Sequence, residues 1–179
     1  MSATHLVIGN NRTALNAAAR KAAELGFAVQ DLGSNLPGIA QEVGVELAEA
    51  CLEAATQHEQ PLCLLSGGEP VVRLTPTDRL RRGGRNQELV LAAGVRLWDE
   101  DLGRIVILSG GTDGEDGPTD AAGAWFDAAV RDRAQQLKLD PREFLAINNS
   151  YPFFAQTHGL LLTGPTHTNV MDLRVGLIG

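Results

Sequence analysis

Three short apolar runs of this chain end alike, in a serine or threonine followed by glycine. They are LCLLSGGE at 62–69, IVILSGGT at 105–112 and LLLTGPT at 160–166. A short apolar run bounded by turn residues predicts a buried strand, and glycine at its end lets the backbone approach a ligand closely. In open α/β sheets, ligands bind beyond the carboxyl ends of strands. The pattern therefore predicts an α/β fold with glycine loops at strand C-terminal ends, forming a rim for an anion or nucleotide.

The segments between these runs alternate between helix-like and strand-like patterns. We expect helices over 13–25, 39–58, 86–98 and 124–139, one or two shorter helices over 142–154, and further strands at 5–8, 27–32 and 170–178. Residues 71–74 either continue an extended path or begin another strand. This alternation favours a largely parallel or mixed sheet flanked by helices. Asp172 and Arg174 are the polar positions of the last strand.

The length of the chain limits how many domains it can form, and its net charge limits which partners it can bind. A chain of 179 residues suits one compact domain, with or without a short appendage. We expect residues 1–60 to form an N-terminal βαβα segment and residues 61–179 to form the main α/β domain. The net charge of -7 and the pI near 5.0 argue against a partner that is a nucleic acid or an acidic membrane.

The expected location is the cytoplasm. The N-terminal residues lack the basic and apolar regions of a signal peptide, and no apolar run is long enough to span a bilayer. Cys51 and Cys63 lie in apolar surroundings outside any metal-binding spacing, which indicates buried free thiols in a reducing compartment.

An acidic loop follows the second glycine run. Residues 110–123 contain four carboxylates, at Asp113, Glu115, Asp116 and Asp120. Clustered carboxylates repel one another unless a cation or several N–H groups compensate. One hypothesis is a Mg²⁺ ion held by Asp113 and Asp116, and another is a set of substrate hydroxyls. A purely local interpretation lets Thr119 or Asp120 cap the next helix and Asp113 close a turn.

A basic loop precedes the helix expected at 86–98. Five of the thirteen arginines lie at positions 73, 79, 81, 82 and 85. Arg85 and Asn86 would stand at the helix N-terminus, where the helix dipole disfavours a cation. An arginine placed there suggests a carboxylate or phosphate partner.

Five motifs, and the order in which they occur, resemble those of the class II glycerate kinases. In that family they lie in the part called the MOFRL domain. They are LLSGGE, GGRNQE, LSGGTDGxDGPTDAAGA, NSYxFF and TGPTxTNVxDL, and the resemblance covers residues 6–178. It implies ATP-dependent phosphorylation of D-glycerate to 2-phosphoglycerate with Mg²⁺. It also implies a cleft shared with a larger N-terminal domain, to whose end residues 1–60 could correspond. That domain, or a second copy of this chain, is the expected protein partner.

The resemblance and the glycine pattern together define candidate site residues. Arg85 is the candidate catalytic residue, which would bind the glycerate carboxylate or steady the charge of the transferring phosphate. Candidate substrate- and nucleotide-binding residues lie around the glycine runs: Ser66, Gly67, Gly68, Glu69, Asn86, Ser109, Gly110, Gly111, Thr112, Asp113, Gly164, Thr166 and Asn169.

Two other functions stay open from the sequence. The three glycine loops and Arg85 could form a stand-alone module that binds a small phosphorylated or carboxylate metabolite without catalysis. Some proteins similar to this family are named hydroxypyruvate reductases, although no G-x-G-x-x-G dinucleotide motif follows a strand here.

Overall fold

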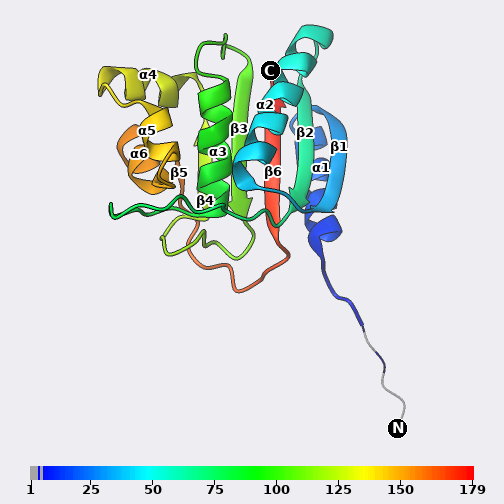
Figure 1. Ribbon diagram of the computed structural model, residues 1–179. Coiled ribbons are helices and arrows are strands. Elements are labelled where there is room, and N and C mark those ends of the chain that lie inside the picture. Colours follow the sequence, from blue (N-terminus) through cyan, green and yellow to red (C-terminus); the bar gives the residue numbers. More distant parts are fainter. Residues whose placement is uncertain (1–3, 5) are drawn as a thin grey trace.

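The computed structural model describes residue 4 and residues 6–179, which form a six-stranded sheet with helices on both faces (Figure 1). The strands are β1 (Ala28–Leu36), β2 (Leu62–Gly68), β3 (Ile105–Gly111), β4 (Gly123–Phe126), β5 (Leu160–Leu161) and β6 (Asp172–Ile178). The helices are α1 (Asn11–Glu24), α2 (Ala40–Gln57), α3 (Arg85–Arg96), α4 (Ala128–Gln136), α5 (Pro141–Leu145) and α6 (Ser150–Thr157). None of the helices in this part of the chain is both long and apolar enough to cross a membrane.

The last strand is inserted into the middle of the sheet. The spatial order is β1-β2-β6-β3-β4-β5, and β6 runs antiparallel to both of its neighbours. Since β2 and β3 both oppose β6, they point the same way and their glycine ends reach the same edge. In the register of the ladder, Gly68 and Gly111 both stand opposite Asp172. The first residue of β6 is therefore held between the two glycine ends.

The α/β fold class is confirmed, and the sheet is mixed rather than largely parallel. Among the described strands, β1 and β2 form the one parallel pair, because β6 returns between β2 and β3 and reverses the direction there. Residues 71–74 do not form a strand, and Val71 makes a single isolated bridge to Ile39.

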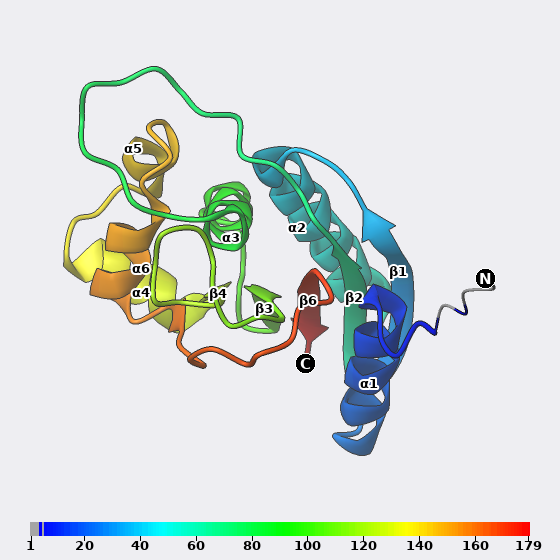
Figure 2. The ribbon, with the colours of Figure 1, turned by 90° about the horizontal axis from the view of Figure 1, so that it is seen from below.

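Helices lie on both faces of the sheet (Figure 2), and a hydrophobic cluster packs on each face, the smaller one around α1, β1, β2 and β6. Leu62 and Leu64 of β2 face α2 and α3, whereas Cys63 and Leu65 face α1, as the alternation of side chains along a strand requires. β2 is buried on both faces, which explains its unbroken apolar sequence.

Some of the expected elements were wrong. Residues 6–8 form no strand, and Leu6 and Ile8 are exposed; His5, the first residue of that expected strand, lies outside the described residues. The helix expected over 124–139 is shorter at its start. There the chain first pairs with β3 as β4, and α4 begins only where the Asp127 carboxylate accepts a hydrogen bond from the Val130 N–H at 2.8 Å.

The position of α3 depends on close packing against α2. A Cβ atom on Gly44 of α2 would lie 2.1 Å from the carbonyl oxygen of Leu89 in α3. Glycine is therefore required where the two helices cross, and this contact fixes where α3 lies on the sheet.

Glu88 joins three segments inside the protein. It lies in the first turn of α3 and is only 2 % exposed. Its Oε1 atom accepts hydrogen bonds from Gln41 Nε2 and Asn148 Nδ2, both at 2.9 Å. These contacts tie α2 and the 148 turn to the start of α3, although burial raises the pKa of the Glu88 carboxyl.

Gly44→Ala should destabilise the protein. Helix propensity alone favours alanine by about 1 kcal/mol, so the substitution would be stabilising if the helices did not touch. The backbone contact with Leu89 predicts the opposite sign, a loss of about 1–3 kcal/mol of unfolding free energy. Urea denaturation followed by circular dichroism measures this sign, and a stabilised variant would contradict the close helix packing.

Glu88→Gln should change how stability depends on pH. The pKa of Glu88 is raised from its ordinary 4.5, so the stability that its protonation contributes is fully present below pH 4.5 and is lost as the pH rises through the folded-state pKa. Glutamine does not titrate. The unfolding free energy of the variant relative to the wild type should therefore increase from acidic towards neutral pH.

Glu59→Gln, at an exposed position, is the matched control for this measurement. Urea unfolding at several pH values should show no comparable trend for the control. The same trend in both variants would mean that the burial of Glu88 is not its source.

Candidate functional site

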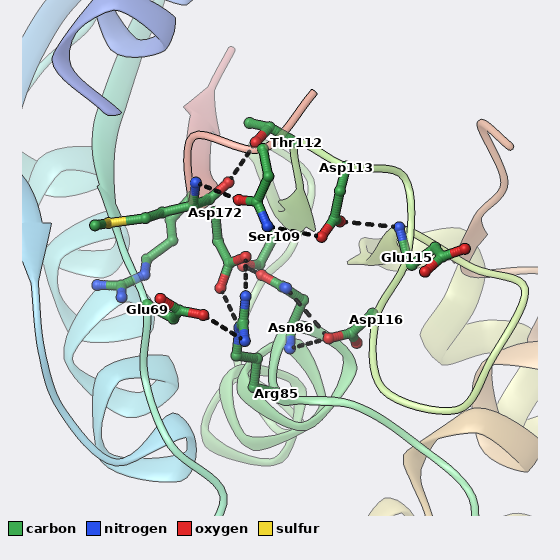
Figure 3. Close-up of polar contacts among 12 residues, drawn as sticks. Glu69, Arg85, Asn86, Ser109, Thr112, Asp113, Glu115, Asp116 and Asp172 are labelled. Atoms are coloured by element: carbon green, nitrogen blue, oxygen red, sulfur yellow. Dashed lines mark hydrogen bonds and ion pairs between the residues drawn. The ribbon is translucent and has the colours of Figure 1, made fainter. Parts of the chain in front are cut away.

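Arg85, the first residue of α3, is held by two carboxylates at the edge where the glycine ends meet (Figure 3). Its Nε donates to Asp172 Oδ2 at 2.7 Å and its Nη2 donates to Asp172 Oδ1 at 2.9 Å. Its Nη1 forms an ion pair with Glu69 Oε1 at 2.9 Å. The carboxylate partner expected for this arginine is thus present, and the fork-to-fork geometry fixes the plane of the guanidinium.

The positive charge of Arg85 is partly accessible to solvent. Asp172 is completely buried, whereas 29 % of the Arg85 side chain is exposed. The guanidinium is charged, as arginines in proteins are, and the hydrogen bonds to Asp172 are the main cause of a raised pKa for Arg85. A guanidinium has five N–H donors, and those not engaged by Asp172 or Glu69 remain available to an anion.

Asp116 caps α3 from thirty residues away in the sequence. Gly84 is at the N-cap position and has no side chain, but Asp116 accepts hydrogen bonds from the backbone N–H groups of Asn86 at 3.0 Å and Gln87 at 2.9 Å. A Cβ atom on Gly84 would lie 2.3 Å from Asp116 Cγ, so glycine is needed for this approach. Burial raises the pKa of Asp116 despite these hydrogen bonds.

Ser109 and Asn86 lie in the buried layer between β3 and α3. Ser109 is fully buried and Asn86 is 1 % exposed. The Ser109 hydroxyl donates to Asn86 Oδ1 at 2.5 Å. Both residues therefore join the helix to the sheet directly beneath the site, and their predicted contact with a ligand stays a prediction.

The acidic loop and the third glycine loop contact each other. The Thr112 hydroxyl donates to the Met171 carbonyl at 2.7 Å, and the Thr166 N–H donates to the Asp113 carbonyl at 2.9 Å. Asn169 Nδ2 donates to the Asp113 carboxylate at 3.1 Å. The structure thus brings four predicted site residues together, on loops that meet before β6 begins.

The predicted glycines occupy the strand ends and the loop beyond β5. Ser66, Gly67 and Gly68 end β2, Gly110 and Gly111 end β3, and Gly164 lies in the third loop. At Gly68 a Cβ atom would lie 2.1 Å from the carbonyl oxygen of Leu36, where β1 passes close to β2. Tight packing therefore accounts for this glycine without a ligand.

A magnesium site at Asp113 and Asp116 stays a prediction. Within residues 4 and 6–179, no three histidine, cysteine or acidic side chains gather in an arrangement that could hold a metal ion. Both oxygens of the buried Asp116 accept hydrogen bonds from the start of α3. Asp113 is half-buried, and its carboxylate accepts from Glu115 N and Asn169 Nδ2.

The sequence did not reveal the role of Asp172, and it suggested a wrong role for Asp120. Asp172 was identified only as a polar strand position, yet it is the main partner of Arg85. The signal was the spacing of Asp172 and Arg174, which places two charges on the same, buried face of one strand. The capping role expected for Asp120 was wrong, because β4 follows that loop instead of a helix, and Asp120 accepts a hydrogen bond from the Tyr151 hydroxyl at 2.7 Å.

A cavity of about 450 Å³ lies beside Arg85. The loop over residues 70–84, the first turn of α3 and Asn148 form its walls, and Arg81 and Arg82 line it as well. Arg82 also stacks on the Tyr151 ring, 4.0 Å from the ring centre. The site edge is therefore bordered by a space with apolar walls and cationic groups.

Known proteins are similar to this chain in sequence and fold. A D-glycerate 2-kinase from Thermotoga maritima is 38 % identical over 175 residues, which cover 96 % of this chain and 41 % of that protein. A putative hydroxypyruvate reductase from Agrobacterium vitis is 42 % identical over 176 residues, covering 97 % of this chain and 45 % of that protein. The crystal structure of glycerate kinase from Thermotoga maritima superposes with a TM-score of 0.90 at 37 % identity, covering 97 % of this chain and 42 % of that one.

The chain thus spans less than half the length of these relatives. Residues 62–172, which contain β2, β3, Arg85 and Asp172, match the MOFRL family. The resemblance inferred from the motifs is confirmed: this chain belongs to the MOFRL family, and its relatives include proteins named glycerate kinase.

Proposed function

We propose that this chain is the C-terminal portion of an ATP-dependent glycerate 2-kinase. The reaction transfers the γ-phosphoryl group of ATP to the 2-hydroxyl of D-glycerate and yields 2-phosphoglycerate and ADP. The observation that carries the proposal is the fixed, partly exposed guanidinium of Arg85 at the edge where the glycine ends meet. The name of the Thermotoga relative, a D-glycerate 2-kinase, supports the choice of substrate and position.

Arg85 suits phosphoryl transfer because that reaction needs positioning and charge stabilisation more than covalent help from the protein. The bond from the 2-hydroxyl oxygen to phosphorus forms as the bond to the ADP oxygen breaks, and negative charge spreads over the transferring group. A guanidinium already fixed by Asp172 and Glu69 can face that charge without reorganising. The same N–H groups can alternatively bind the glycerate carboxylate.

Mg²⁺ would supply charge neutralisation on the phosphates when bound. It favours one or two carboxylates together with phosphate oxygens and waters. Asp113 fits such a single protein ligand because it is half-buried on a loop at the site edge. Asp116 fits less well, since it is 1 % exposed and accepts three hydrogen bonds from α3, whereas each Asp113 oxygen accepts one, from Glu115 N or Asn169 Nδ2. The magnesium proposal therefore rests on Asp113.

We also propose that catalysis needs a partner for this chain. Residues 1–60 would correspond to the end of the larger domain of full-length relatives, and residues 61–179 to the MOFRL domain. The larger N-terminal domain would supply the opposite wall of the cleft, and a second copy of this chain is the alternative partner. The cytoplasm is the proposed location of this enzyme.

Adding the N-terminal domain of a full-length relative to this chain should restore activity. The associated pair should release ADP in a reaction that requires both ATP and D-glycerate, whereas neither part alone should do so. Coupled detection of ADP measures the rate, and gel filtration shows association. An associated pair that does not turn over would contradict the kinase proposal, and NADH oxidation with hydroxypyruvate would favour a reductase instead.

Arg85→Lys should reduce kcat of the reconstituted enzyme by about a hundredfold or more. Lysine keeps the positive charge but loses the planar fork that binds Asp172 through two N–H groups. Arg79→Lys, at an exposed position of the loop over residues 70–84, is the matched control and should leave kcat unchanged. Equal rates for both variants would show that Arg85 does not act on the transferring group.

A further inference from the structure

A second arginine beside the site, Arg174, is buried but has few hydrogen-bond partners. Arg174 lies on β6 two residues after Asp172, so both side chains point to the same face of the sheet. It is 1 % exposed. Its guanidinium donates one hydrogen bond, from Nη2 to the Leu36 carbonyl at 3.1 Å, and its buried Nε has no partner within the described chain.

Neighbouring carboxylates do not neutralise Arg174 by contact. Both oxygens of Asp172 are engaged by Arg85. Asp172 and, more weakly, Glu46 of α2 attract Arg174 electrostatically, but neither forms an ion pair with it in the described part of the chain. Burial lowers the pKa of Arg174, yet an arginine remains charged in proteins. A buried donor of this kind is normally matched by water or by a bound anion.

Arg174 is one of the residues that line a cavity. The volume of this cavity is about 190 Å³, and it opens between the end of β1, α2 and the sheet. One water molecule occupies about 30 Å³ of liquid, so the cavity holds roughly six water-sized groups. Its polar lining is Arg174, Ser66 and Glu46, and the rest of its lining is aliphatic: Leu32, Leu36, Val43 and Leu47.

We propose that this cavity binds the carboxylate of a small monocarboxylic acid. The carboxylate would accept hydrogen bonds from Arg174 and from the Ser66 hydroxyl, while a short carbon chain lies against the leucine and valine walls. A planar guanidinium matches a carboxylate with two parallel hydrogen bonds. The negative charge of the ligand would thus pair with the guanidinium of Arg174, which has no ion-pair partner in the described chain.

The exposed carboxylate of Glu46 lines the same cavity and would make it selective for the charge of the ligand. A single negative charge on the ligand is balanced by Arg174, but a second one would meet the Glu46 carboxylate in the same cavity. The pocket therefore accepts a monocarboxylate and rejects an acid that carries a phosphate. D-Glycerate has the required size and charge, and only this choice of natural ligand rests on the proposed kinase function.

Thermal unfolding and calorimetry with D-glycerate, L-lactate and inorganic phosphate test the pocket on the chain itself. Both carboxylates should bind saturably and raise the Tm, by about 5–10 °C at a concentration about a hundredfold above Kd. Phosphate should give no shift. Glu46→Gln should allow phosphate to bind, because the repelling charge is removed.

Arg174→Met should weaken carboxylate binding at least tenfold without lowering the Tm of the ligand-free chain, because methionine removes a buried charge that lacks a partner. Arg20→Met, at an exposed position of α1, is the matched control and should bind like the wild type. If Arg174→Met does not fold, Arg174→Lys takes its place and should fold but bind at least tenfold more weakly.

Two results would overturn the proposal. One is the absence of carboxylate binding by the wild-type chain at tens of millimolar ligand. The other is an Arg174 variant that has lost stability but keeps the full ligand shift, which would make Arg174 a purely structural residue. Either result is separate from the kinase proposal, which the reconstituted reaction tests through ADP release.

Discussion

The bidentate pair between Asp172 and Arg85 connects the topology of the sheet to the site. Insertion of β6 between β2 and β3 places Asp172 opposite both Gly68 and Gly111, and leaves its carboxylate completely buried. A buried carboxylate needs a cation, and breaking a fully buried pair costs about 3–5 kcal/mol. The cost is smaller here because Arg85 is 29 % exposed, but the pairing still determines where the start of α3 lies.

The same pairing places a cation at a helix N-terminus, which the helix dipole disfavours. Asp116 offsets this by placing a buried carboxylate on the N–H groups of Asn86 and Gln87. The chain thus holds alternating charges around the start of α3. Their close fit depends on glycine at position 84, where a side chain would collide with Asp116.

Many of the helices and strands can be predicted from the local sequence. The pairing of segments that are distant in the sequence cannot. The apolar runs at 62–65 and 105–108 predicted β2 and β3, and the glycine ends predicted a shared edge. Residues 123–126 pair with β3 as a strand, a contact between distant segments that the local sequence did not reveal. Arg85 was recognised from its place at a helix start. Asp172 was not recognised as its partner, because strand order decides which glycine ends it faces.

The central claim is that Arg85 and Asp172 act as one unit, and a double-mutant cycle on unfolding free energy measures this directly. Arg85→Met, Asp172→Asn and the double variant are compared with the wild type. Because each single variant leaves the other group without its partner, the summed losses should exceed the loss of the double variant by about 1–3 kcal/mol. Losses that add to within about 0.5 kcal/mol would contradict the claim that this pair holds the site together.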